Sequence, residues 1–227
     1  MDLSTGTMRV ALISISHCPS LATRNLRRFC LAHADVRGRA EFFLFDCHLR
    51  EFLRSHVKSI RQLSFDTAAD ELLCRLVELR PAIIAFSCYL WNTETSIRLA
   101  SQIKQMLPDV QIVLGGPDVG GPRAKWLLAQ HSEVDVIVDG DGEIPFLELV
   151  RCHVAGEPRA LAGLPSVTYR AGNEIVRNAA TVGSPDLSLL TNVFDELPSS
   201  AELGRWEWPY LLYETMRGCP YQCSYCM

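Results

Sequence analysis

Short apolar runs alternate with amphipathic stretches along the chain from Arg9 to about Ala155. Apolar runs of this length are typical of strands that are buried on both faces, and the stretches between them are long enough for helices. Repeated strand and helix units build a parallel sheet that helices cover. The pattern therefore predicts an α/β domain made of five strand–helix pairs.

The breaks in the pattern set the expected bounds of these elements. Pro81 ends the second helix, and Gly115, Gly116 and Pro117 interrupt the chain after the fourth strand. The expected strands are 10–15, 41–45, 83–87, 111–114 and 134–138. The expected helices are 21–34, 66–79, 93–107, 122–131 and 144–155.

Five parallel strands in such a Rossmann-like domain commonly take the flavodoxin-like order 2-1-3-4-5. Ligands of these sheets bind beyond the carboxyl ends of the strands, where the winding direction reverses between strands 1 and 3. The loops after strands 1, 3, 4 and 5 are therefore expected to share one site.

The pattern changes after residue 156. Residues 166–170 and 174–177 flank Ala171-Gly172-Asn173, which indicates a β-hairpin appendage. Glycines and prolines interrupt 179–209, which is expected to be a linker with one helical turn, and 210–215 is expected to be a strand. The expected divisions are a Rossmann-like domain at 1–156, a hairpin and linker at 157–208, and the start of another domain at 209–227.

The composition excludes several partners. The chain has 48% hydrophobic residues and a formal net charge of −4, and its Lys and Arg are scattered, so no nucleic-acid partner is expected. No apolar run approaches the ~20 residues of a membrane span, and the N-terminus does not resemble a signal peptide. Six cysteines are dispersed singly, as in proteins of reducing compartments, so a cytoplasmic protein is expected.

Three cysteines close to the C-terminus, Cys219, Cys223 and Cys226, have the spacing C-x3-C-x2-C. Thiolates suit iron–sulfur clusters, and three of them can hold three irons of a 4Fe-4S cluster, which leaves the fourth iron open. The alternative is part of a zinc site. A structural zinc usually needs four ligands, and the nearest remaining thiol is Cys152, so zinc is the weaker interpretation.

This cysteine run resembles the cluster loop of radical S-adenosyl-L-methionine (SAM) enzymes. In that family the amino and carboxylate groups of SAM chelate the open iron. An aromatic residue commonly precedes the last cysteine, beside the SAM adenine, and Tyr225 occupies that position here. The resemblance implies a 4Fe-4S cluster held by the three cysteines, with Tyr225 in contact with SAM.

Three expected loops combine residues that suit a large, flat ligand decorated with amides. Aromatic side chains offer apolar faces, amide and hydroxyl groups bind amides, and glycines let the backbone come close. Taken singly, each loop is weak evidence, because glycine turns are common and Trp91 could pack in a core. The candidates are Ser87, Cys88, Tyr89, Trp91 and Asn92 after strand 3; Gly115, Gly116, Pro117 and Asp118 after strand 4; and Gly140, Gly142 and Glu143 after strand 5.

Together with the cysteine run, these loops resemble cobalamin-dependent radical SAM enzymes, of the class B methyltransferase kind. The corresponding family segments read Phe-Ser-x-Tyr-x-Trp-Asn, Gly-Gly-Pro and Gly-Glu-Gly-Glu. This chain departs from the last by having Asp141 in place of the first glutamate. The resemblance spans the whole chain and implies a cobalamin-binding domain followed by the first strand of a radical SAM partial barrel. Asp118 and Glu143 could instead serve only as helix-start acids.

Two histidines are candidates near the cobalt. His17 follows strand 1, where relatives often have a histidine, and is expected to line the cofactor pocket or to cap a loop. Asp46-Cys47-His48 imitates the Asp-x-His-x-x-Gly loop that ligates cobalt elsewhere. It follows strand 2 instead of strand 1 and has Glu51 in place of the glycine, so a solvated loop histidine is the favoured interpretation of His48.

The resemblance also implies a reaction. SAM would methylate cob(I)alamin and would also be cleaved to a 5'-deoxyadenosyl radical; methylcobalamin would then deliver a methyl group to an unactivated carbon of a small-molecule or natural-product substrate. A reductant such as flavodoxin or ferredoxin is an expected partner. Alternatives are a cobalamin-binding module without catalysis, and a non-methylating relative that forms or contracts rings. A radical SAM barrel needs on the order of 200 further residues, so the chain alone is expected to be truncated and inactive.

Overall fold

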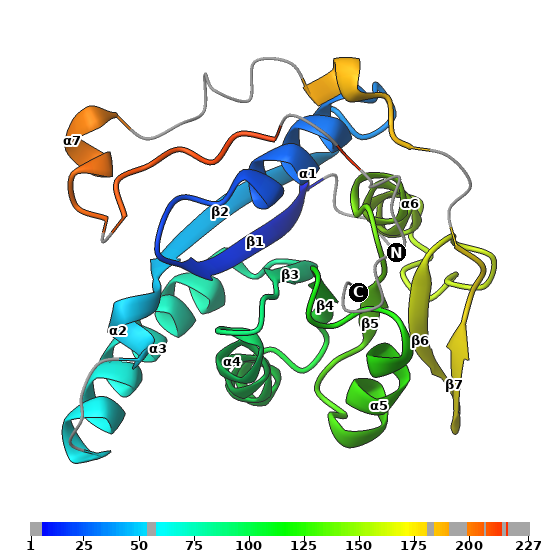
Figure 1. Cartoon of the computed structure of the whole chain (residues 1–227). Helices are drawn as coiled ribbons and strands as arrows, with labels where there is room; N and C mark the ends of the chain where they lie inside the picture. Colours follow the sequence, from blue (N-terminus) through cyan, green and yellow to red (C-terminus); the bar gives the residue numbers. More distant parts are fainter. Residues whose placement is uncertain are drawn as a thin grey trace, which may run out of the picture.

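One mixed sheet organises the molecule (Figure 1). The computed structural model describes residues 6–53, 58–180, 184–190, 199–206, 208–214 and 217. Within these residues a 7-stranded sheet has the order β2-β1-β3-β4-β5-β6-β7. The strands are β1 (Met8–Ser16), β2 (Ala40–His48), β3 (Ile83–Ser87), β4 (Gln111–Gly115), β5 (Val136–Val138), β6 (Val167–Ala171) and β7 (Glu174–Arg177).

The strands β2, β1, β3, β4 and β5 are mutually parallel, so the predicted order 2-1-3-4-5 is confirmed. The hairpin of β6 and β7 was expected to be an appendage. Instead β6 pairs antiparallel with β5, with Val138 opposite Val167, and thereby extends the same sheet. The pairing covers the β5 edge, which would otherwise expose unpaired backbone groups.

Helices cover both faces of the parallel part of the sheet (Figure 1). The helices α1 and α6 pack on one face, and α3, α4 and α5 pack on the other. The helices are α1 (Leu21–Ala32), α2 (Leu49–Leu53), α3 (Lys58–Leu79), α4 (Thr93–Met106), α5 (Pro122–Gln130), α6 (Glu143–Val154) and α7 (Ser200–Leu203), with a 3-10 turn at Leu187–Leu190.

Strand β1 shows why the apolar residues of a strand follow one another without alternating with polar residues. Val10 and Leu12 point into the core beneath α1 and α6, whereas Ala11, Ile13 and Ile15 point into the core beneath α3, α4 and α5. All five side chains are completely buried. A strand with helices on both faces needs apolar residues at every position, and the sequence supplies them.

Local capping chemistry fixes where several helices begin. Ser20 is the N-cap of α1, and its hydroxyl accepts a hydrogen bond from the Thr23 backbone N–H at 3.3 Å. Pro122 opens α5, where its missing N–H costs nothing. Ser199 and Glu202 form a reciprocal capping box at α7, which supplies the helical turn expected in the linker.

The structure differs from the sequence-based bounds at several elements. Strands β1 and β2 are longer than expected, and the short helix α2 was not anticipated. Helix α3 begins at Lys58 instead of Asp66, since each residue added to a formed helix gains a backbone hydrogen bond whether or not it belongs to an apolar face. The strand expected at 210–215 was wrong over residues 210–214, which belong to no strand or helix.

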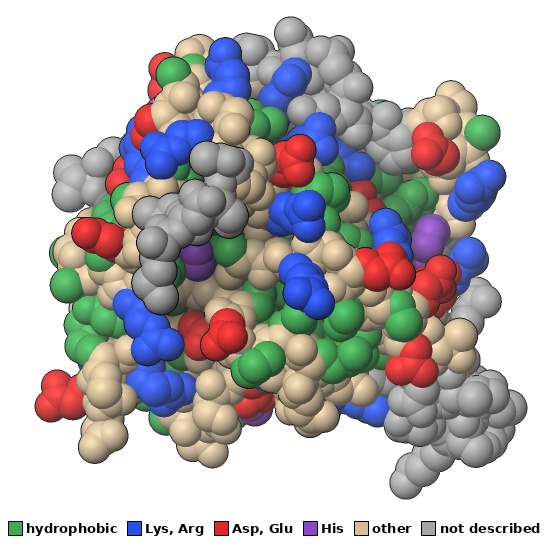
Figure 2. Space-filling view, turned by 180° about the vertical axis from the view of Figure 1, so that it is seen from behind, with side chains coloured by type: hydrophobic (Ala, Val, Ile, Leu, Met, Phe, Trp, Pro, Cys, Tyr) green, Lys and Arg blue, Asp and Glu red, His purple; other side chains and the backbone are tan. Residues whose placement is uncertain are grey.

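Two surface properties bear on the expected partners. None of the helices within the described ranges has both the length and the apolar character needed to cross a membrane. Figure 2 shows Lys and Arg side chains interspersed with Asp and Glu side chains on the face opposite to that of Figure 1. Over the coloured residues of that face, the positive charge is therefore not gathered into one patch of the kind that binds nucleic acid.

We expect replacement of Gly116 by alanine to destabilise the fold strongly. Gly116 has a φ of 116°, and a Cβ there would lie 2.3 Å from the Cys88 carbonyl oxygen. The G116A variant is expected to lose about 3 kcal/mol or more of unfolding free energy, measured by urea denaturation. The control is G172A in the hairpin turn, where φ is 61° but the space is open and the cost should be about 1 kcal/mol. Equal costs at the two positions would contradict this reason.

Candidate functional site

The loops that follow β1, β3, β4 and β5 lie at the same edge of the sheet. The four strands are parallel, and β1 pairs with β3, β3 with β4, and β4 with β5. The register aligns Ser14 of β1 with Ser87, Ser87 with Gly115, and Gly115 with Val138. The carboxyl ends of four neighbouring strands thus bring the loops predicted from the sequence together.

An aromatic pair stands on the loop after β3. The Tyr89 and Trp91 rings are stacked at 4.8 Å between centroids with an interplanar angle of 5°. Trp91 is 49% exposed, and Leu90 between them is 81% exposed. Burial raises the pKa of the Tyr89 hydroxyl, against a smaller lowering by the hydrogen bond to Ser87, so this phenol stays protonated at neutral pH. The loop therefore presents a flat apolar surface with a hydrogen-bond donor.

Asn92 holds this loop in shape. Its side chain is 1% exposed, and Nδ2 donates to the Ile15 carbonyl at 2.9 Å and to the Ser87 carbonyl at 3.0 Å. Oδ1 accepts from the Tyr89 backbone N–H at 2.7 Å. Both amide donors are therefore used inside the protein, and Asn92 ties the end of β1 to the end of β3. The side chain expected to face a ligand serves to position the aromatic pair.

Cys88 supports the same loop from the core side. Its side chain is completely buried in the core beneath α3, α4 and α5, and burial raises the pKa of the thiol to about 12. Its backbone N–H donates to the Gly115 carbonyl at 2.7 Å. Cys88 thus joins the β3 loop to the β4 loop through its backbone, and its thiol faces away from the edge.

The loop after β4 offers an acceptor that no described residue uses. Pro117 is exposed, whereas Asp118 is 9% exposed and its Oδ1 pairs with Arg123. The Asp118 Oδ2 atom is buried and has no hydrogen-bond partner among the described residues. A buried carboxylate oxygen without a partner is costly, so a ligand that donates N–H groups would satisfy it.

The loop after β5 has an unobstructed backbone at Gly140 and an acidic side chain, Asp139, that a hydrogen bond holds in place. Gly140 has a φ of 69°, and no atom lies within 4 Å of the position of a Cβ there. Asp139 accepts from the Gly121 backbone N–H at 2.6 Å, which joins the β4 and β5 loops. Gly142 precedes α6, where a Cβ would lie 3.3 Å from the Leu26 side chain. The backbone at Gly140 is therefore accessible to a ligand, and the residues around it are held in place.

A segment that was expected to be linker and strand crosses this edge. The Trp206 ring stacks on His48 at the end of β2, at 4.0 Å between centroids, and the Trp208 ring stacks on His17 after β1, at 4.2 Å. The Trp208 backbone N–H also donates to the His17 carbonyl at 3.1 Å. Arg217 reaches Glu143 at the start of α6 with an Nη2–Oε1 distance of 2.6 Å. We call residues 206–217, of which 207, 215 and 216 are not described, the crossing segment.

Asp46 and His48 do not lie in a loop of the kind that their motif imitates. Both residues lie within β2 and not in a loop after it. Asp46 pairs with Arg24 at 2.7 Å and accepts from the Ser20 backbone N–H at 3.3 Å, so its carboxylate is committed to the start of α1. Burial lowers the pKa of His48, whose ring stacks on Trp206. The expectation of a solvated loop histidine was wrong, because His48 is a half-buried strand residue.

The predicted cluster and SAM residues are close to the C-terminus. The cluster cysteines Cys219, Cys223 and Cys226 and the SAM-contacting Tyr225 lie outside the described residues.

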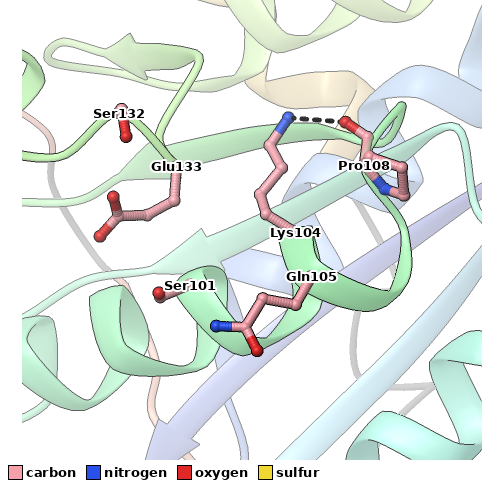
Figure 3. Close-up of a pocket in the computed structure, with 6 residues that line it drawn as sticks. All are labelled: Ser101, Lys104, Gln105, Pro108, Ser132 and Glu133. Atoms are coloured by element: carbon pink, nitrogen blue, oxygen red, sulfur yellow. Dashed lines mark hydrogen bonds between the residues drawn. The ribbon is translucent and has the colours of Figure 1, made fainter.

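A shallow hollow of about 460 Å³ lies at the amino ends of the strands, between α4 and the loop before β5 (Figure 3). Its Lys104 is engaged by the carbonyls of Pro108 and Val110 and by Asp135. The predicted loops are at the opposite edge of the sheet, so this hollow is separate from them.

Comparison with known proteins agrees with the loop arrangement. Residues 47–150 match the family described as the B12 binding domain. The chain is 35% identical over 155 residues to the cobalamin-dependent radical SAM methyltransferase TokK of Streptomyces tokunonensis, covering 65% of this chain and 22% of that protein. It is 35% identical over 157 residues to 2-(S-pantetheinyl)-carbapenam-3-carboxylate methyltransferase of Streptantibioticus cattleyicolor, covering 64% and 22%.

A solved structure shares the fold. The cobalamin-dependent S-adenosylmethionine radical enzyme OxsB, with aqua-cobalamin and S-adenosylmethionine bound, matches with a TM-score of 0.56 at 15% identity. The match covers 83% of this chain and 25% of that one. The chain thus spans about a fifth to a quarter of the length of these relatives. The resemblance to cobalamin-dependent radical SAM enzymes is confirmed.

We expect N92A to loosen the β3 loop. The substitution leaves the Ile15 and Ser87 carbonyls and the Tyr89 N–H without their present partner. The unfolding free energy should fall by about 3 kcal/mol in urea denaturation, since buried groups lose hydrogen bonds. The exposed hairpin residue Asn173 provides the control, because N173A should cost less than about 0.5 kcal/mol. A loss of stability below about 1 kcal/mol for N92A would show that the amide is not structural.

Proposed function

We propose that this chain, which carries a B12 binding domain of the kind found in cobalamin-dependent radical SAM enzymes, holds cobalamin against the carboxyl edge of its sheet. A second part of the proposal concerns the reaction of the whole protein. In a protein of the relatives' length, the bound cofactor would serve methyl transfer from SAM to an unactivated carbon of a small-molecule substrate. Cobalamin binding is assigned to the residues of this chain, and turnover to the longer protein.

The observation that carries the proposal is the joint placement of three loops with complementary chemistry. A corrin ring is broad and flat and is surrounded by amide side chains, so it requires apolar area, close backbone and hydrogen-bonding groups. The stacked Tyr89 and Trp91 offer the apolar area, and the open space at Gly140 offers the close backbone. The described residues therefore fit the cofactor that the relatives' names imply.

Hydrogen bonding at this edge also suits amides. The unpartnered Oδ2 of Asp118 accepts N–H groups, and the protonated Tyr89 hydroxyl donates to carbonyl oxygens. Ser87, at the end of β3 and aligned with Gly115, makes a side-chain hydrogen bond to Tyr89. A donor and an acceptor at the rim of an apolar surface would orient a ligand that carries both amide groups. His17, at the end of β1, is proposed to border the same site beneath Trp208.

The cofactors supply the difficult chemistry in such an enzyme, namely methyl carriage at cobalt and reductive cleavage of SAM at an iron–sulfur cluster. The residues of this chain would bind and orient them. We propose that Cys219, Cys223 and Cys226 ligate a 4Fe-4S cluster and that Tyr225 contacts SAM. An external reductant such as flavodoxin or ferredoxin would deliver electrons in the cytoplasm.

Titration with hydroxocobalamin tests the proposed binding. The chain is expected to retain the corrinoid through gel filtration in a 1:1 ratio. The W91A variant should bind at least about tenfold more weakly, because a half-exposed aromatic face against the corrin contributes over 1 kcal/mol. The control is W126A, which removes a similarly exposed tryptophan from α5 and should leave the affinity unchanged. No retained corrinoid, or equal weakening by both variants, would contradict the proposal.

Isotope labelling tests the axial ligation of cobalt without altering the protein. Both histidines near the site have rings stacked on tryptophans, so we expect neither imidazole to bind the metal. The electron paramagnetic resonance spectrum of bound cob(II)alamin should therefore be the same for the ordinary chain and for a chain with all 6 histidines labelled with ¹⁵N. A change in the nitrogen splitting on labelling would reveal a cobalt–histidine bond.

A further inference from the structure

The crossing segment touches the carboxyl edge of the sheet at both of its ends. Its stacked tryptophans lie on β2 and on the loop after β1, and its last described residue, Arg217, lies on the loop after β5. The segment therefore runs along the edge at which cobalamin binding is proposed.

Arg217 joins the crossing segment to the start of α6 through ion pairs. Its Nη2 atom lies 2.6 Å from the Glu143 Oε1 atom and 2.9 Å from Oε2 of Glu214, and its Nη1 atom lies 4.0 Å from Oδ2 of Asp141. The side chains of Arg217 and Glu143 are 12% and 5% exposed. A pair withdrawn from water to this degree is screened little, so removal of one partner leaves a buried charge uncompensated.

The position of Glu143 at the start of α6 holds its carboxylate in one place. Glu143 is the first residue of α6, where the helix dipole and the free N–H groups favour a negative charge. Its carboxylate is thus fixed on the loop 139–143, and Arg217 is the cation that approaches it. The hydrogen bonds to Glu143 and then to Glu214 raise the pKa of Arg217 further, so its guanidinium stays charged throughout the neutral range.

We propose that Arg217 is a positioning residue, whose ion pair with Glu143 fixes the chain that leads into the cysteine run against the β5 loop of the cobalamin site. Arg217 precedes Cys219 by two positions in the sequence. The inference rests on the proposed function for the meaning of both ends of the contact. The ion pair itself is a property of the protein without cofactors.

The contact predicts coupling between the cofactor site and the crossing segment. A ligand that orders the loop 139–143 also fixes Glu143, and thereby favours the docked position of Arg217. By reciprocity, docking of Arg217 raises the affinity of the loop for the same ligand by the same factor. Loss of the ion pair should therefore release the segment and uncouple it from cobalamin.

Limited chymotrypsin digestion of the full chain measures the release. The cleavage sites Tyr210, Leu212 and Tyr213 lie on the crossing segment, so the cleavage rate there reports the fraction of molecules in which the segment is undocked. We expect R217Q to accelerate cleavage at these sites at least about tenfold, since a buried ion pair loses a partner. Hydroxocobalamin should slow the cleavage of the unaltered chain and have no such effect in R217Q.

Two further variants separate positioning from general stability. R217K keeps the positive charge but loses the planar fork that bonds to two carboxylates, so it should accelerate cleavage only about threefold. R177Q is the matched control, because Arg177 pairs with Asp139 of the same loop but belongs to β7. It should leave the cleavage rate of the crossing segment unchanged. Far-ultraviolet circular dichroism checks that each variant is folded.

The outcomes distinguish this inference from the proposed function. If R217Q and R177Q accelerate cleavage equally, or if R217Q cleaves like the unaltered chain, the positioning role is overturned. If R217Q releases the segment while the unaltered chain binds no cobalamin, the positioning role is supported and the proposed function fails. If cobalamin protects R217Q as well as it protects the unaltered chain, the coupling to the cofactor site is overturned.

Discussion

The parallel hydrogen-bond ladder of β1, β3, β4 and β5 is the constraint on which the rest of the structure depends. It places four carboxyl ends at one edge and aligns Ser87, Gly115 and Val138 on neighbouring strands. Because of this register, loops that are far apart in the sequence meet. Helices on both faces then bury the sheet, so the strands need continuous apolar runs.

Two groups of residues at this edge have different roles. Asn92, Gly116 and Asp139 are directed inward, where an amide, a tight backbone approach and a carboxylate join one loop to the next. Tyr89 and Trp91 are directed outward and remain partly exposed. The inward group uses its hydrogen bonds inside the protein, which leaves the outward group rigidly placed for a ligand.

The sequence predicted the strand order and the loops well, because apolar runs and glycine breaks are local signals. It did not reveal the role of Asn92, since an amide that bonds Ile15 and Ser87 is chemically the same as one that bonds a ligand. The sequence also did not predict the pairing of β6 with β5 or the contact of Arg217 with Glu143, because both join residues that are far apart in the chain. Tertiary packing decides such contacts, and no periodicity records them.

A crystal structure of the chain grown with hydroxocobalamin tests the proposed site most directly. The corrin ring is expected at the carboxyl edge, with contacts to the Tyr89–Trp91 pair, to Asp118 and to the backbone at Gly140. A corrin ring bound elsewhere, for example in the hollow beside Lys104 at the amino edge, would contradict the proposed site. A corrin at the carboxyl edge whose cobalt is bound by His17 or His48 would support the site and contradict the expectation that neither histidine binds the metal.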